Sequence, residues 1–164
     1  MKKAIYLFSI FFFATCMTGC LDWAQSHYTP QVGCSQFIKN TTDTLGIGID
    51  SETGYTKLDT IAIGDEVKFI VTFNALSNNL LGAQINTDTT LLSMTYGPLD
   101  DIASAMLPES DPANGQFFFA DGYMGVRIPV TFVAKKAGSY KLEFIATSDS
   151  KYSPATYRIT GNVK

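Results

Sequence analysis

The sequence has little of what most catalytic and metal sites need. It contains one histidine, His27, and three cysteines. A histidine base must be held within hydrogen-bond reach of its partner, and a zinc site needs several nitrogen or sulfur ligands. A histidine-dependent triad and a zinc site are therefore not expected. No glycine-rich loop opens a helix, so a nucleotide-phosphate site has no support either.

Positive charge is also scarce. Twelve Lys and Arg residues face fifteen Asp and Glu residues, and the net charge is −3. The basic residues form no patch of the kind that neutralises a phosphate backbone, so nucleic acid is not an expected partner. The cysteines are too few for a disulfide framework, and a core of this size needs none.

The N-terminus has the three parts of an export signal. Lys2 and Lys3 precede an apolar run of eleven residues at 4–14, far short of the ~20 that a membrane-spanning helix needs. Residues 17–20 then read Met-Thr-Gly-Cys. This segment resembles the lipobox of bacterial lipoproteins, with Met17 in place of the usual Leu. The resemblance implies cleavage before Cys20, a covalent lipid on Cys20, and a membrane as partner through that lipid.

Two alternatives remain open for this segment: an ordinary secretory signal or an uncleaved anchor. Without lipid on Cys20, a disulfide between Cys20 and Cys34 becomes available. The residue after Cys20 is Leu21, not the Asp that resembles an inner-membrane retention signal. We therefore expect a cell-envelope protein at the outer membrane, facing the periplasm or the surface.

With the lipobox resemblance, we expect the chain to divide into a signal peptide at 1–19, a lipidated tether at 20–35, and one domain at 36–164. Loss of Lys2 and Lys3 would take the net charge from −3 to −5. The tether has no periodicity, whereas from residue 36 onward short runs of apolar and β-branched residues alternate with Gly, Asp, Asn and Ser. That pattern predicts an all-β domain.

Period-two alternation is clearest in three segments. In each of them, at 66–75, 126–133 and 140–147, every second residue is apolar, so the apolar side chains fall on one face. This pattern predicts strands with one buried face. Pro129, in the second of these, lacks an N–H and predicts an edge or sheet-switching strand. A last strand is predicted at 156–163, and this strand and the one at 126–133 are the expected neighbours of the 140–147 strand. Residues 100–107 suggest one or two helical turns. Shorter strands are predicted at 80–86, 91–96 and 116–120. We expect about seven to nine strands in an antiparallel β-sandwich.

The strand after Gly138 carries a further resemblance. Gly138, Tyr140 and Leu142 resemble the tyrosine corner of immunoglobulin-like domains, which implies an immunoglobulin-like sandwich with a hydrogen bond from the Tyr140 hydroxyl to the upstream backbone. Leu142 stands where antibody domains have Cys, and the core Trp is missing. As a whole the chain resembles small immunoglobulin-like lipoproteins of Gram-negative bacteria, most of them without an assigned activity.

Aromatic residues gather around the long 97–116 segment. Consecutive phenylalanines in a strand cannot all face inward, so either the segment folds over Phe118 as a second small core, the simpler interpretation, or the ring is exposed. Tyr96, Phe118 and Tyr123 are the candidate ligand contacts. An exposed ring could stack on a sugar or seat a partner protein.

The same segment is rich in oxygen ligands. Calcium accepts carboxylates, amides and carbonyls without one fixed spacing, so Asp100, Asp101 and Asp111 are weak calcium candidates, with Glu109 and Asn114 nearby; no other cofactor is expected. A carboxylate pair could also serve a glycoside hydrolase. The simpler interpretation is that these residues form solvated turns and caps.

The leading hypothesis is a lipid-anchored envelope module with a binding or structural role and no catalysis. The alternative is a carbohydrate-binding or carbohydrate-active envelope protein that uses loop aromatics or a carboxylate pair. A structural subunit that pairs its exposed strand edges with neighbours is a third hypothesis.

Overall fold

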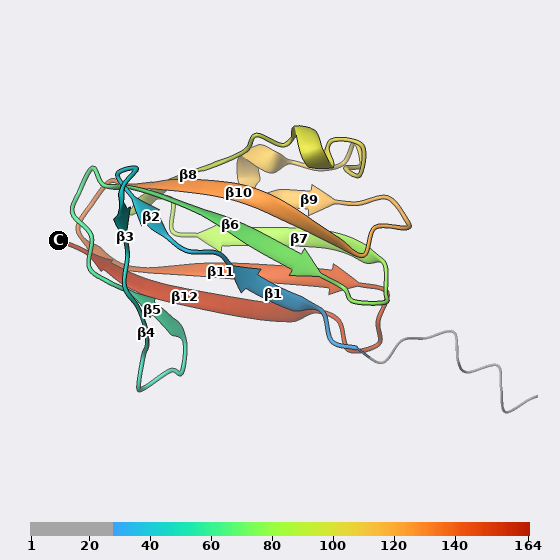
Figure 1. The fold of residues 1–164 in the computed structure, drawn as a ribbon, viewed down its shortest axis with the longest axis horizontal. Coiled ribbons are helices and arrows are strands. Elements are labelled where there is room, and N and C mark those ends of the chain that lie inside the picture. Colours follow the sequence, from blue (N-terminus) through green and yellow to red (C-terminus); the bar gives the residue numbers. More distant parts are fainter. Residues whose placement is uncertain (1–27) are drawn as a thin grey trace, which may run out of the picture.

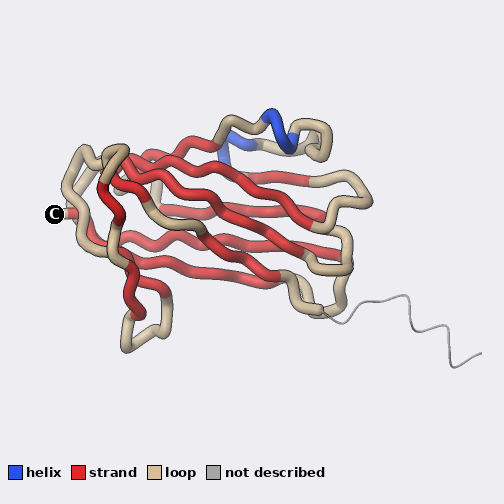
Figure 2. Tube along the Cα trace, viewed as in Figure 1, coloured by secondary structure: helices blue, strands red, loops and turns tan. Residues whose placement is uncertain are grey.

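Two packed β-sheets make up the structure, a computed structural model that describes residues 28–164 (Figures 1 and 2). The first, called here the β6 sheet, contains β1 (Gln31–Cys34), β2 (Ile38–Lys39), β3 (Asp43–Thr44), β6 (Glu66–Asn74), β8 (Leu92–Tyr96) and β10 (Gly125–Ala134). The second, the β11 sheet, contains β4 (Ile47–Ile49), β5 (Thr56–Leu58), β7 (Leu80–Thr87), β9 (Gln116–Phe118), β11 (Gly138–Ser148) and β12 (Ala155–Val163). Two short 3-10 helices, η2 (Asp100–Ile102) and η3 (Pro112–Asn114), lie between β8 and β9.

The strand order is that of an immunoglobulin-like sandwich. In the β6 sheet β1 and β2 pair with β6, and β10 and β8 follow. β1 and β2 together take the place of strand A, β6 that of B, β10 that of E and β8 that of D. In the β11 sheet β12, β11 and β7 take the places of G, F and C. β5 pairs parallel to β12, an exception to the expected antiparallel pairing. The fold prediction is confirmed, and the strands beyond the predicted seven to nine are short.

β9 is an addition to this order. It follows β8 in the chain, which belongs to the β6 sheet, but it pairs with β7 at the edge of the β11 sheet. The segment between β8 and β9 therefore crosses from one sheet to the other, and Figure 1 shows it at the top of the sandwich. This crossing places the aromatic residues of β9 beside β7.

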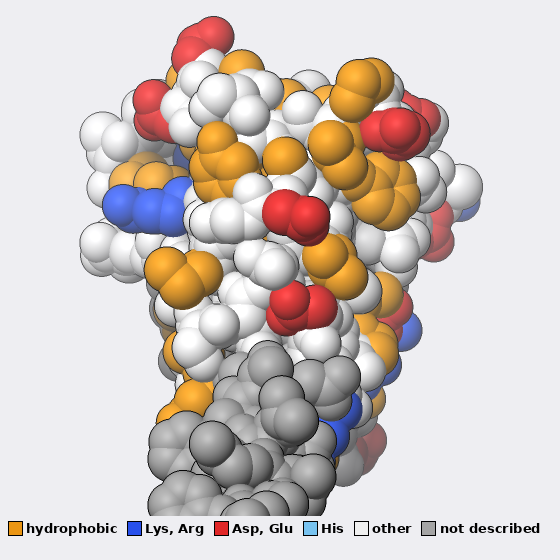
Figure 3. All heavy atoms as spheres, turned by 90° about the vertical axis from the view of Figure 1, so that its right-hand side faces the viewer, with side chains coloured by type: hydrophobic (Ala, Val, Ile, Leu, Met, Phe, Trp, Pro, Cys, Tyr) orange, Lys and Arg blue, Asp and Glu red, His pale blue; other side chains and the backbone are white. Residues whose placement is uncertain are grey.

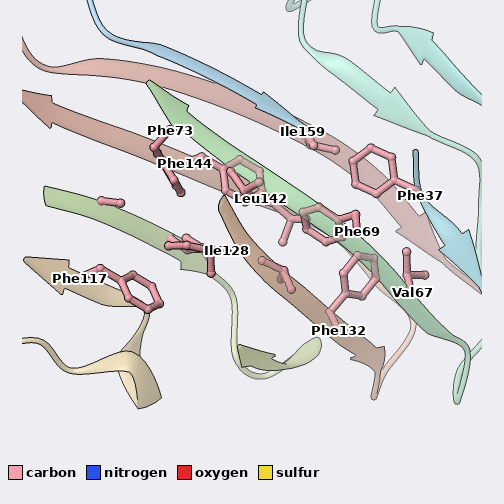
Figure 4. Packing of buried hydrophobic residues seen from close by; sticks show 14 of the residues in the cluster. Phe37, Val67, Phe69, Phe73, Phe117, Ile128, Phe132, Leu142, Phe144 and Ile159 are labelled. Carbon is pink, nitrogen blue, oxygen red and sulfur yellow. The ribbon is translucent and has the colours of Figure 1, made fainter. Parts of the chain in front are cut away.

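The core lies between the two sheets and comes from the alternation seen in the sequence. Figure 4 shows Phe69, Phe132 and Phe144 among the side chains that meet between the two sheets. The inward residues of β6, β10 and β11 are all buried: Val67, Phe69, Val71, Phe73, Val126, Ile128, Val130, Phe132, Tyr140, Leu142, Phe144 and Ala146. The Phe69 ring packs at 4.6 Å from Phe37 and at 6.0 Å from Phe144, measured between centroids. The faces of all three strands are as predicted.

The neighbours of β11 are only partly as predicted. β11 pairs with β12, as expected, but its other neighbour is β7. β10, expected beside it, lies in the opposite sheet. The connection at 135–137 crosses between sheets, as the E–F connection of an immunoglobulin-like fold does, and a short connection in the sequence does not distinguish that from a hairpin.

Pro129 lies at a local sheet edge although β10 is an interior strand. β10 pairs with β6 along its length, but its pairing with β8 begins only at Val130. The carbonyl of Pro129 accepts the N–H of Gly97 at 3.0 Å, just past the end of β8. The N–H and C=O of a strand residue point to the same side, so the missing donor of Pro129 faces the side where β8 has ended.

The boundary predicted between tether and domain is wrong. Residues 31–34, assigned to the 20–35 tether, form β1 and pair with Val71–Asn74 of β6. Val32 and Cys34 pack against the core. The described domain thus begins by Gln31 rather than at residue 36. The sequence did not reveal this strand, because four residues that include Gly33 are too few to show a periodicity.

Candidate functional site

One aromatic ring stands on the outer face of the β11 sheet. Phe117 and Phe119 are 1% and 2% exposed, whereas Phe118 between them is 43% exposed. In the β7–β9 ladder Phe117 lies opposite Ala83 and faces the core, and Phe118 lies opposite Gly82 and faces outward. The sequence required one of these rings to point away from the core, and the structure shows that it is Phe118.

The 97–116 segment does not cover this ring, so the simpler of the two interpretations is wrong. The segment instead binds the backbone of Phe118: Leu107 N–H donates to its carbonyl at 2.9 Å, and the Ser110 hydroxyl oxygen accepts its N–H at 2.9 Å. These bonds close the outer edge of β9. A covered edge resists strand pairing with other chains and holds the ring in place.

A hollow of about 230 Å³ lies beside the ring, lined by Leu81, Gly82, Ala83, Gln84, Gln116, Phe117, Phe118 and Thr147. Gly82 is what leaves room for it. A Cβ on Gly82 would lie 3.1 Å from the Phe117 carbonyl oxygen and 3.6 Å from Cδ1 of Phe118. The floor of the hollow is therefore backbone, with an aromatic wall on one side and polar side chains on the other.

Two amide side chains border the hollow. Gln84 of β7 and Gln116 of β9 stand directly opposite each other in the ladder. Nε2 of Gln84 donates to Oδ1 of Asn86 at 2.9 Å, which orients the Gln84 amide. Amides both donate and accept hydrogen bonds, so the border is polar without being charged.

The row of hydrogen-bonded side chains extends across the sheet from Asn86 to an ion pair between Glu143 and Arg158. Asn86, Glu143 and Arg158 lie side by side on β7, β11 and β12. Nδ2 of Asn86 lies 3.5 Å from Oε2 of Glu143, and Nε of Arg158 donates to Oε1 of Glu143 at 2.7 Å. The guanidinium carbon of Arg158 is 5.5 Å from the ring centroid of Tyr55. One chain of contacts thus fixes polar side chains on neighbouring strands.

The electrostatics of this row favour the ionised form of Glu143. The hydrogen bond from Arg158, followed by the one from Asn86, lowers the pKa of the Glu143 carboxyl. A general acid in a glycoside hydrolase needs the opposite shift. Glu143 therefore acts as an ionised anchor that orients Asn86 and Arg158.

The two tyrosines predicted alongside Phe118 pack elsewhere. The Tyr96 ring contacts the Phe117 ring edge-on, with centroids 5.6 Å apart, and burial raises the pKa of Tyr96 to about 12. Tyr123 packs against the core, and its hydroxyl is 3.5 Å from that of Ser104. Neither ring lines the hollow beside Phe118.

The acidic residues of the 97–116 segment do not converge. Asp100 and Asp101 lie on η2, while Asp111 caps η3 and accepts Nδ2 of Asn114 at 2.7 Å. Within residues 28–164, no three His, Cys, Asp or Glu side chains are grouped so as to hold a metal ion. Asp111 thus has the capping role that the simpler interpretation gave these residues.

The predicted lipidation site, Cys20, and the signal peptide lie outside the described residues. Cys34 is half-buried in β1, and burial raises the pKa of its thiol to about 12. In the part of the chain that the structure describes, no helix is long and apolar enough to cross a membrane.

Sequence reasoning missed Gly82, Gln84, Gln116 and Thr147. Gln84 and Gln116 occupy outward positions of predicted strands, which is a weak signal. The decisive information, that β9 pairs with β7, depends on residues more than thirty positions apart in the chain.

Comparison with known proteins identifies no family for this chain. No protein-family model and no curated protein matches the sequence. Similar solved structures include a family 123 glycoside hydrolase from Clostridium perfringens, 10% identical with a TM-score of 0.47 over 84% of this chain and 27% of that one. A DUF4466 family protein from Parabacteroides merdae is 9% identical, with a TM-score of 0.45 over 81% of this chain and 44% of that one.

A third similar structure is AggA, the major subunit of aggregative adherence fimbriae type I from Escherichia coli. It is 10% identical, with a TM-score of 0.36 over 85% of this chain and all of that one. The chain spans under half the length of the first two proteins. At these identities and scores the likenesses carry no argument about function.

Proposed function

We propose that the protein is a lipid-anchored, non-catalytic binding module of the bacterial cell envelope, and that the hollow beside Phe118 is its binding site. The lipobox-like residues 17–20 support the anchor, because they follow a charged and an apolar segment in the order that lipoprotein signals have. A single sandwich follows the predicted lipid site at Cys20. Such a module sits at the outer membrane, facing the periplasm or the surface.

The single observation that carries the binding role is the exposure of Phe118. A 43% exposed ring beside a hollow with few convergent polar groups has the composition of a ligand site. The Phe118 backbone bonds to Leu107 and Ser110 at the outer edge of β9, and on the β7 side the neighbouring Phe119 N–H donates to the Leu81 carbonyl at 3.0 Å. The ring is thus presented by a fixed backbone.

The ligand class that fits this surface is a glycan, the second of the two hypotheses from the sequence. A sugar ring offers an apolar face to an aromatic ring and hydroxyl groups to neighbouring amides. Gln84 and Gln116 stand opposite each other beside the ring. No Lys, Arg, Asp or Glu lines the hollow, so an uncharged sugar suits it better than an acidic one.

A glycan array probed with the domain, followed by calorimetry on any sugar bound, tests this proposal. Phe118→Ala should abolish the binding, and Gln84→Ala should weaken it. Tyr152→Ala is the matched control, because Tyr152 is an aromatic residue with 50% exposure on another loop and its replacement should leave binding as in wild type. Binding that survives Phe118→Ala, or an array without any bound glycan, would contradict the glycan assignment.

The anchor is tested separately. Mass spectrometry of the protein extracted from membranes should show a chain that starts at Cys20 and carries acyl groups. A mass that matches the unmodified chain, or a Cys20–Cys34 disulfide, would overturn lipid anchoring without bearing on the sugar site.

A further inference from the structure

The loops at one end of the sandwich form a single hydrogen-bonded surface. They are the loops at 75–79, 119–124 and 149–154, and they lie at the right-hand end in Figure 1. Asn79 joins all three: its N–H and Nδ2 donate to Asp149 at 3.0 and 2.9 Å, and its Oδ1 accepts Gly122 N–H at 3.0 Å. We call this surface the entry end, because the described chain enters the sandwich there.

Tyr28, the first described residue, belongs to the entry end. Nδ2 of the buried Asn78 lies 3.4 Å from the Tyr28 carbonyl oxygen, and β1 follows from Gln31. The connection to Cys20 therefore leaves from the same end as the three loops.

Exposed apolar side chains lie on this surface. Tyr28 is 58%, Met124 is 56% and Tyr152 is 50% exposed. Figure 3 looks onto the entry end and shows hydrophobic side chains spread among polar and acidic ones. The Lys151 amine lies 5.2 Å from the Tyr152 ring centroid. An aromatic ring paired with a lysine suits the boundary between acyl chains and lipid headgroups.

The surface also carries acidic groups. Asp121 is exposed in the loop at 119–124, and Asp149 is held by Asn79. With one lysine against two carboxylates, electrostatic attraction to anionic lipid is not what would hold this end at a membrane. The contact would depend on the apolar side chains and on the tether.

The length of the tether restricts which end can face the lipid. Eight steps along the chain separate Cys20 from Tyr28, which reach about 28 Å when fully extended. β11 alone has 11 residues and is about 36 Å long. The opposite end of the sandwich, near Ile63 beside the C-terminal Lys164, is therefore farther from Tyr28 than the tether can reach.

We propose that the entry end rests on the bilayer to which Cys20 is attached, with Tyr28, Met124 and Tyr152 in contact with the lipid interface. The inference rests on the lipid anchor of the proposed function. In this orientation the strands stand away from the membrane, and the hollow beside Phe118 opens on the side of the sandwich close to the lipid surface, because Leu81, Phe118 and Thr147 adjoin the three loops.

Fluorescence of single tryptophans in the full lipidated chain tests this orientation. Trp23 is first changed to Phe, and Met124→Trp or Ile63→Trp is then introduced. The two sites are matched, since both side chains are 56% exposed and they lie at opposite ends. The protein is reconstituted into vesicles of phosphatidylethanolamine and phosphatidylglycerol, with and without brominated acyl chains.

The expected result is that the Met124→Trp emission moves to shorter wavelength in vesicles and is quenched by the brominated lipid, while Ile63→Trp changes in neither respect. Equal signals from the two sites, or stronger quenching at Ile63→Trp, would overturn the orientation. Flotation of the same samples keeps the two proposals apart. If the protein floats with the vesicles but Met124→Trp is not quenched, lipid anchoring stands and the proposed orientation is wrong. If the protein does not float, both proposals are wrong.

Discussion

The phenol of Tyr140 lies directly against the backbone of Gly161. The two residues are opposite each other in the β11–β12 ladder, and a Cβ on Gly161 would be 2.8 Å from Cε1 of Tyr140 and closer still to its hydroxyl. The ring reaches across to β12 and contacts Phe132 of the other sheet at 5.7 Å between centroids. Gly161 therefore provides the space that the Tyr140 ring occupies.

Replacement of Gly161 by Ala should destabilise the domain by about 1–3 kcal/mol, because the added methyl group overpacks the core against a ring that is itself enclosed. Gly33→Ala is the control, since Gly33 also lies in a strand but a Cβ added to it would meet no heavy atom within 4 Å. Urea unfolding of both variants measures the difference. Equal stability of the two variants would show that the Tyr140 ring can move aside.

Tyr140→Phe should leave the stability unchanged or raise it slightly. The tyrosine-corner resemblance implied a hydrogen bond to the upstream backbone, worth about 1 kcal/mol. In the structure the buried Tyr140 hydroxyl has no hydrogen-bond partner among the described residues, so that implication is not supported. The approach over Gly161 turns the hydroxyl toward β12.

Tyr157→Phe is the comparison for this change. The Tyr157 hydroxyl lies 2.7 Å from the Thr56 hydroxyl, and its loss should cost about 0.5–1.5 kcal/mol. Thermal or urea unfolding of the two Tyr→Phe variants measures the contrast. A larger loss of stability for Tyr140→Phe than for Tyr157→Phe would support the hydrogen bond that the tyrosine-corner resemblance implied.

Glu143→Gln should reduce stability near neutral pH more than in acid. The hydrogen bond from Arg158 lowers the pKa of Glu143 in the folded protein, so the ionised carboxylate stabilises the native state. This contribution is complete above the unfolded pKa of about 4.3 and is lost as the pH falls through the lower folded pKa. The melting temperatures of wild type and variant should therefore converge as the pH falls below that unfolded pKa.

Glu109→Gln provides the control for this pH dependence, because Glu109 is exposed in the 97–116 segment. Its melting temperature should follow that of wild type across the same range. A gap between wild type and Glu143→Gln that stays constant with pH would mean that Glu143 contributes by packing rather than by charge.

Phe69→Ala should cost about 3–5 kcal/mol, as a large deletion in a closed core. The Phe69 side chain is 4% exposed and contacts the rings of Phe37, Phe132 and Phe144. Phe118→Ala, at an exposed ring, should cost much less in the same urea titration. A loss at Phe69 no greater than that at Phe118 would contradict the packing in Figure 4.

The candidate site was only partly predictable. The run of phenylalanines at 117–119 identified Phe118 as a residue in need of an explanation, because adjacent strand residues face opposite ways. Tyr96 and Tyr123 were grouped with it by closeness in the sequence, but they pack toward the core. The hollow itself depends on the missing side chain of Gly82, whose partner strand lies beyond the whole 97–116 segment.

By itself, the sequence determined which residues face the core, because burial of one face of a strand imposes an alternation that a single segment displays. It also determined the all-β class and the candidate lipid site. Only the tertiary structure decided which strands are neighbours: Phe118 opposite Gly82, Tyr140 opposite Gly161, and β10 in the sheet facing β11. Pairing between distant segments depends on how two sheets fill the space between them, and no local pattern contains that information.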